Sequence, residues 1–104
     1  MSRTILQRRL IDVSDRLKRL RAELAVTDEQ CAFIEAEADD ARLRSLVSET
    51  PLADAEARDV QRHADAHGRQ RDALRRAVRE LEAEQDALLD RMAAGLPSDL
   101  EAPR

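Results

Sequence analysis

The residues with the richest chemistry in this sequence are Cys31, His63 and His67. Two histidines four residues apart share one face of a helix, and a cysteine thiolate brought beside them would supply a third zinc ligand. Cys31 is the only cysteine, however, and a structural zinc site needs four ligands. These residues therefore favour a polar layer inside a helical structure, and no metal site is predicted.

A second candidate is a group of arginines that could follow a phosphate backbone along one helix. Its members are Arg69, Arg71, Arg75, Arg76 and Arg79. Asp72 and Glu80 interrupt the group, the chain has a net charge of −4, and its one aromatic residue, Phe33, lies elsewhere. The pattern favours a solvated, ion-paired face, so nucleic acid is not an expected partner.

Catalytic motifs are missing from the sequence. It contains no glycine-rich phosphate loop and no nucleophile placed beside a base. We therefore expect a protein that is not an enzyme and that uses no cofactor.

The elements that carry these residues are two long helices. With 104 residues, 38% of them charged, and only two glycines, the chain allows one small all-α domain with a lean core. Ser2 can cap a helix over residues 3–47, residues 48–50 form a turn, and Thr50 with Pro51 can start a helix over residues 51–94. Gly95 would end that second helix, which leaves a flexible polar tail at 96–104. One alternative is a break after Val26, because residues 27–30 have the form of a capping box.

Apolar residues recur with strict alternation of four and three positions in both segments, which predicts a coiled-coil seam. In the first segment the seam comprises Leu6, Leu10, Val13, Leu17, Leu20, Leu24, Thr27, Cys31, Ile34, Ala38 and Ala41. In the second it comprises Ala53, Ala57, Val60, Ala64, His67, Arg71, Leu74, Val78, Leu81, Gln85, Leu88 and Met92. Folding the chain back at the turn pairs seam residues whose numbers add to 98 in every layer. We therefore predict an antiparallel two-helix coiled-coil hairpin covering residues 1–95.

Charges beside the seam agree with this pairing. Residues 3–21 carry seven basic and two acidic groups, and they lie opposite residues 77–95, which carry five acidic and two basic groups. Arg16 with Glu84 and Arg44 with Glu56 are expected ion pairs, whereas Arg21 near Arg75 is an expected repulsion.

Five apolar residues outside the seam are the predicted partner-binding residues. Val26 and Phe33 lie one heptad apart on the outward side of the first helix, surrounded by alanines. Leu46, Val47 and Leu52 flank the turn, where packing against one another is an equally good interpretation. We expect a protein partner, and dimerisation of the hairpin into a four-helix bundle would cover the first of these groups.

The shape of the predicted hairpin resembles two families. One is the WXG-type substrates of type VII secretion, but the turn reads Ser48-Glu49-Thr50-Pro51 and lacks their Trp-x-Gly motif. The other is the coiled-coil arm of Gre- and DksA-type factors, which reaches into RNA polymerase with an acidic tip. Glu49, Asp54 and Glu56 are acidic and near this turn, although the spacing of those families' tip motifs is absent.

The sequence therefore predicts a non-enzymatic coiled-coil interaction module: an adaptor, a scaffold or a small regulatory subunit. The alternative is a regulator of nucleic acid or RNA polymerase that uses the tip or the arginines. A lone cysteine, no membrane-spanning run and no signal-type N-terminus favour the cytoplasm. Seventeen of the eighteen basic residues are arginine, which suggests a bacterial source with a G+C-rich genome.

Overall fold

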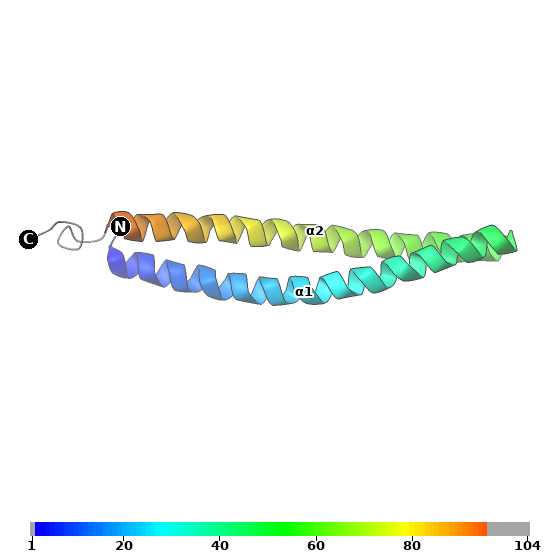
Figure 1. The fold of residues 1–104 in the computed structure, drawn as a ribbon, viewed down its shortest axis with the longest axis horizontal. Coiled ribbons are helices and arrows are strands. Elements are labelled where there is room, and N and C mark those ends of the chain that lie inside the picture. Colours follow the sequence, from blue (N-terminus) through cyan, green and yellow to red (C-terminus); the bar gives the residue numbers. More distant parts are fainter. Residues whose placement is uncertain (1, 96–104) are drawn as a thin grey trace, which may run out of the picture. The chain divides into compact units, whose positions relative to one another are not determined.

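The computed structural model describes residues 2–95, which form two long α-helices and, in that range, no strand. Helix α1 spans Arg3–Ser48 and helix α2 spans Pro51–Ala94 (Figure 1). The helices pack against each other as an antiparallel hairpin, so the predicted all-α fold is confirmed. The predicted tail at 96–104 lies outside the described residues.

Both helices begin at the capping residues that the sequence indicated. The Oγ of Ser2 accepts a hydrogen bond of 3.2 Å from the backbone N–H of Ile5. The Oγ1 of Thr50 accepts one of the same length from the N–H of Ala53, and Pro51 occupies the first helical position. Each cap satisfies a backbone donor that has no partner inside the helix.

Glu49 connects the two helices in an unusual backbone conformation. Its φ angle is 53°, in the left-handed region that glycine tolerates best. Its N–H still donates to the carbonyl oxygen of Ser45 at 3.0 Å, so the last turn of α1 is closed before the chain reverses. At the other end, α2 stops before Gly95 as predicted, but Gly95 does not take a positive φ.

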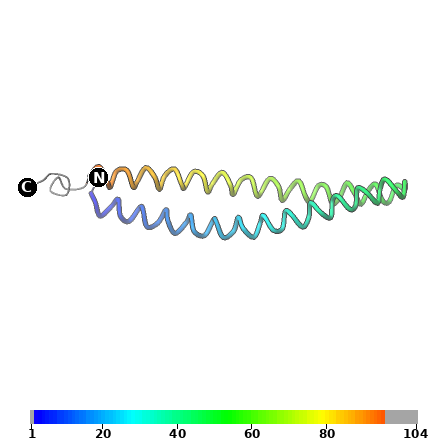
Figure 2. The backbone as a smooth tube through the Cα atoms, viewed as in Figure 1, coloured from blue at the N-terminus to red at the C-terminus, as the bar shows by residue number. Residues whose placement is uncertain are grey.

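Helix α1 runs through Thr27 without interruption (Figure 2). The alternative of a break after Val26 is therefore wrong. Thr27 is 3% exposed and occupies its seam position, and a side chain buried against α2 is not placed to start a new helix.

Within the hairpin, the helices form two compact units, each with its own core. The terminal unit comprises the described residues 2–21 and 77–95. Its buried side chains are the larger aliphatic ones: Leu6, Val13, Leu17, Val78, Leu81 and Leu88. Each buried leucine contributes about 1.5–3 kcal/mol, so this core is the expected source of most of the stability.

The turn unit comprises residues 22–76 and has a core of small and polar residues. Its buried side chains are Thr27, Cys31, Ala38, Ala41 and Ala64. Larger seam residues such as Leu24, Ile34 and Leu74 are only partly buried. Each of these small buried side chains removes less apolar surface from water than a buried leucine of the terminal unit does.

Polar contacts between the helices agree with the predicted register. In the terminal unit, Gln85 was paired with Val13, and its Nε2 donates to the Oγ of the adjacent Ser14 at 3.1 Å. Arg21 lies 2.9 Å from Glu82 in that unit, and in the turn unit Asp28 lies 3.3 Å from Arg75. Each of these pairs joins α1 to α2 inside its own unit, as an antiparallel pair of helices allows.

The expected ion pairs were wrong in detail. Glu84 pairs with Arg9 at 3.4 Å instead of Arg16, and no pair joins Arg44 to Glu56 among the described residues. Arg21 and Arg75, for which a repulsion was expected, each form an ion pair with a carboxylate. Exposed arginines reach several acids at similar cost, so heptad spacing alone does not select the partner.

Candidate protein-interaction surfaces

Large apolar side chains are exposed on both sides of the turn. Leu46 is 67% exposed, Val47 84% and Leu52 70%. Packing among these residues thus leaves most of their surface in water, and the interpretation as a closed staple across the turn is not supported. Leu43, 59% exposed, joins them, and we call Leu43, Leu46, Val47 and Leu52 the turn cluster. Sequence reasoning missed Leu43, although it lies three residues before Leu46 and four before Val47 on one helix face.

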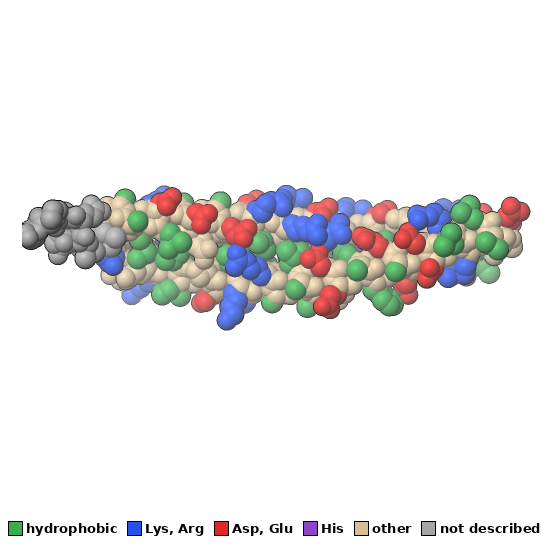
Figure 3. Space-filling view, viewed as in Figure 1, with side chains coloured by type: hydrophobic (Ala, Val, Ile, Leu, Met, Phe, Trp, Pro, Cys, Tyr) green, Lys and Arg blue, Asp and Glu red, His purple; other side chains and the backbone are tan. Residues whose placement is uncertain are grey.

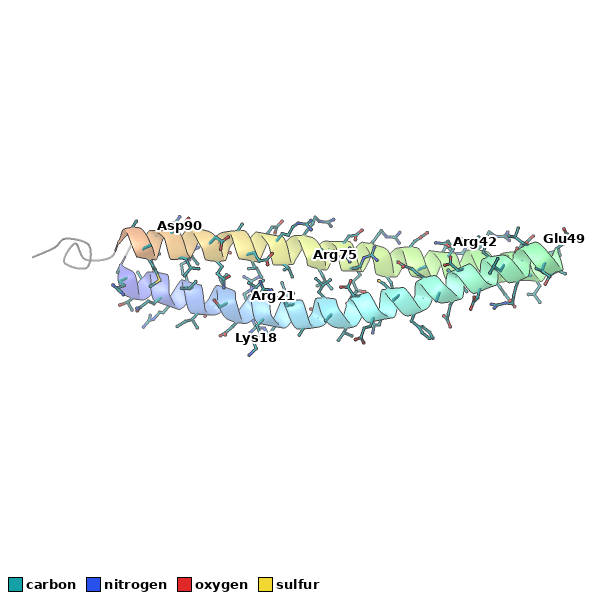
Figure 4. All side chains as sticks on the ribbon, in the orientation of Figure 1. Lys18, Arg21, Arg42, Glu49, Arg75 and Asp90 are labelled. Carbon is teal, nitrogen blue, oxygen red and sulfur yellow. The ribbon has the colours of Figure 1, made fainter. Side chains whose placement is uncertain are left out.

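The backbone that carries the turn cluster is held by contacts across the turn. The Oγ of Ser45, in the last turns of α1, donates a hydrogen bond to Oδ1 of Asp54, in the first turn of α2. The Thr50 cap lies between them, and Figure 4 labels Glu49 at the reversal itself. Asp54 near the start of α2 also interacts favourably with the helix dipole. These contacts fix the ends of both helices and so place the cluster on a defined backbone.

The surroundings of the turn cluster are acidic. Residues 35–65 contain nine acidic and four basic residues, a net charge of −5. Arg42 is engaged by Asp39 at 2.7 Å, and Arg62 pairs with Asp59. In Figure 3, hydrophobic side chains lie among charged ones at this end of the helices.

A second exposed apolar surface lies on α1 of the turn unit. Val26 is 55% exposed and Phe33 66%, and the alanines predicted around them are exposed as well: Ala22, Ala25, Ala32 and Ala36. We call these six residues the outer face of α1. Helix geometry places them opposite the buried Thr27 and Cys31, so α1 is apolar on two sides here.

The three residues considered for zinc are not brought together. Cys31 is 2% exposed, whereas the side chain of His63 lies in solvent. Nδ1 of His67 lies 3.1 Å from the carbonyl oxygen of His63 in the same helix, which engages that nitrogen. Residues 2–95 contain no group of three or more histidine, cysteine or acidic side chains arranged to hold a metal ion.

Part of the arginine group is engaged by carboxylates. Arg71 lies 3.3 Å from Glu35 across the hairpin and 3.4 Å from Asp72. Partial desolvation opposes its charge, but the hydrogen bond and charge of Asp72 and the charge of Glu35 raise the pKa of the guanidinium above its ordinary value. The side chain thus reaches from its seam position to carboxylates at the surface and stays protonated.

The hollows on the described surface are open grooves. One, of about 600 Å³, lies beside Gly68, where Glu35, Asp65 and Arg71 contribute to its lining. A smaller groove of about 350 Å³ runs beside Phe33 and includes Ile34 and His67. Neither encloses a small molecule in the way that ligand pockets do.

Comparison of the chain with protein-family models, curated proteins and solved structures gives no match. In addition, neither α1 nor α2 has an apolar stretch long enough to cross a membrane. The function must therefore be argued from the surfaces described above.

Proposed function

We propose that this protein is a non-enzymatic coiled-coil interaction module whose turn cluster binds a protein partner in the cytoplasm. The observation that carries the proposal is the exposure of four large apolar side chains at one reversal of the chain. A polar chain with 38% charged residues gains nothing for folding from apolar groups left in water. Binding would bury them, and such a patch is typical of an interaction surface.

The charge around the turn cluster defines the kind of partner. With a net charge of −5 over residues 35–65, a complementary surface presents an apolar groove with arginine or lysine at its rim. The acidic rim would speed encounter and orient the partner, while the four apolar side chains supply most of the affinity. The caps and the Ser45–Asp54 hydrogen bond reduce the entropy lost on binding, because the cluster is already held.

The test is affinity purification of the tagged full chain from its host, followed by binding measurements with each purified partner. Val47→Glu and Leu52→Glu should weaken that binding by at least about tenfold, because each places a charge in an apolar contact. The matched control is Leu89→Glu, in the terminal unit, where the side chain is 48% exposed and the affinity should not change. Every variant should unfold at the denaturant concentration of the parent chain, since the altered side chains are exposed.

The same purification tests the nucleic-acid alternative. If the arginines bind phosphates, DNA or RNA should bind at low salt, and the affinity should fall steeply as salt is added. Such binding, lost on replacing Arg69, Arg76 and Arg79 with alanine and unaffected by Val47→Glu, would overturn the proposal. Partners that bind Val47→Glu and the parent chain equally well would do the same.

A further inference from the structure

The outer face of α1 is a second exposed apolar surface, which comes earlier along α1 than the turn cluster. It contains Val26 and Phe33 with four alanines around them, and all six side chains are exposed. Its members form two groups one heptad apart, Ala22, Ala25 and Val26 and then Ala32, Phe33 and Ala36, with Glu29 at the position between them. The seam that faces α2 occupies the other side of the same turns. This part of α1 therefore has the pattern of a helix packed between two neighbours, of which α2 is one.

Charged residues flank the outer face with opposite sign at its two ends. One turn before Ala22 come Lys18 and Arg19, and one turn after Ala36 come Asp39 and Asp40. Figure 4 shows the Lys18 side chain projecting from α1 on the side away from α2, whereas Arg21 lies toward α2. The order along this side of α1 is thus basic, apolar, acidic.

This order is self-complementary in one orientation only. If two copies of α1 pack antiparallel, the basic end of each face meets the acidic end of the other, and the apolar stretches coincide. In a parallel arrangement like charges would meet at both ends, which disfavours it. Charge therefore selects a second copy of this chain, in the antiparallel sense, as the occupant of the face.

We infer that the outer face of α1 is the contact surface between two copies of this chain, packed antiparallel about a two-fold axis at Glu29. Spacing determines the position of the axis, because Glu29 is the midpoint between Ala22 and Ala36. In this register Phe33 packs against Ala25 of the partner subunit, whose small side chain leaves room for the ring. Lys18 faces Asp40 of the partner subunit, and each contact occurs twice because of the symmetry.

One residue opposes the arrangement and makes it testable. Glu29 is exposed, forms no ion pair within the part of the chain that the structure describes, and would meet its own copy at the axis. Two carboxylates facing each other weaken association. Glu29→Gln should therefore lower the dissociation constant of the dimer by about threefold or more. No contact of Glu29 within a single hairpin would produce this effect.

The association itself is measured by sedimentation equilibrium of the full chain from about 1 μM to about 1 mM. The dimer should appear within this range, and Phe33→Glu should weaken it by at least about tenfold, because it places a charge in the apolar part of the contact. Leu89→Glu is the control, since Leu89 lies on α2, and it should leave the dimer unchanged. A parent chain that is monomeric throughout the range overturns the inference.

Charge exchange tests the orientation. Lys18→Asp and Asp40→Lys should each weaken the dimer by about tenfold, because each replaces two attractive pairs by two repulsive ones. The double variant exchanges the two charges, so both attractive pairs form again. Its dimer affinity should be within about threefold of that of the parent chain. A double variant as weak as the single ones would contradict the pairing of these two residues.

Disulfide formation tests the register, in a Cys31→Ala background that removes the buried native thiol. Glu29→Cys should form a covalent dimer under mild oxidation, because only a residue at the axis meets its own copy in an antiparallel pair. Ala22→Cys alone should not, but a mixture of Ala22→Cys and Ala36→Cys chains should cross-link. Efficient dimers of Ala22→Cys with itself would show a parallel contact and overturn the inference. The cross-linking result does not depend on partner binding by the turn cluster. Failure of this inference can therefore be distinguished from failure of the proposed function, which the Val47→Glu variant tests.

Discussion

The terminal unit and the turn unit differ in whether their bulky apolar side chains are buried or exposed. In the terminal unit, six leucines and valines are buried, and the exposed large apolar residues are Ile5, Ile11 and Leu89. In the turn unit, the buried residues are alanines, a threonine and a cysteine, whereas six large apolar side chains are exposed. The latter are the turn cluster together with Val26 and Phe33. Both units thus have the same heptad spacing, but they differ in which of their large apolar side chains are buried.

The comparison separates what the heptad period specifies from what side-chain size specifies. The period determines which positions face the opposite helix, and it is unbroken in both units. Side-chain size determines how much apolar surface leaves water at those positions. A unit that fully buries only small residues and exposes several large ones gains less from its own fold and has more to gain from a partner. The terminal unit is accordingly the expected source of stability, and the turn unit the expected site of binding.

The largest expected effect concerns the core of the terminal unit. Leu17 is 1% exposed, and Leu17→Ala should lower the free energy of unfolding by about 2–4 kcal/mol, because it removes buried methyl groups and leaves a cavity. Leu46→Ala, the same substitution at a side chain 67% exposed, should change it by less than about 0.5 kcal/mol. Urea unfolding followed by circular dichroism measures both values. Equal losses would contradict the division of roles between the two units.

A smaller effect of opposite sign is expected in the turn unit. Gly68 lies in the middle of α2, where glycine is less favourable than alanine by about 1 kcal/mol. An added Cβ would have the end of the flexible Arg71 side chain as its nearest neighbour, at 3.7 Å, which is ordinary contact. Gly68→Ala should therefore raise the free energy of unfolding by about 0.5–1 kcal/mol. A loss of stability in thermal or urea unfolding would show that the groove beside Gly68 needs the open space.

The smallest effect is expected for the ion pairs between the helices. Arg21 and Glu82 are about half exposed, so Arg21→Ala should cost only a few tenths of a kcal/mol at low salt. The cost should disappear at about 1 M salt, where the Debye length falls to about 3 Å. Arg8→Ala is the matched control, because Arg8 is exposed and makes no ion pair within residues 2–95. A salt-independent loss would mean that the hydrocarbon part of Arg21 stabilises the terminal unit by packing.

Most of the fold could be predicted from spacing and capping residues. Every predicted seam residue is buried or partly buried, and the two caps at Ser2 and Thr50 form as expected. Heptad spacing is a property of the sequence that a rigid helix converts directly into position, which explains this agreement. The competing signal at Thr27 failed because the capping-box pattern is local, while the seam residues on both sides of it favour one continuous helix.

The ion pairs and the details of the turn could not be predicted in the same way. An arginine side chain spans several acids, so the choice of Arg9 over Arg16 by Glu84 depends on rotamers that spacing does not encode. The left-handed Glu49 has no sequence signal, because glycine or asparagine is the usual residue there. The exposure of Val26, Phe33, Leu46, Val47 and Leu52 follows from their positions outside the seam, but what binds them remains a proposal.

The burial of Cys31 has a consequence for how the turn unit can be followed in time. The thiol is 2% exposed, so reagents or oxidants reach it only when the two helices separate around it. The rate at which it is alkylated therefore reports how often that separation occurs, with no engineered label. A partner that stabilises the packed helices of the turn unit would slow the alkylation of Cys31, and one that binds the separated helices would accelerate it. Oxidation of an opened chain to a sulfinic or sulfonic acid would place a charge in this layer and hinder reclosure.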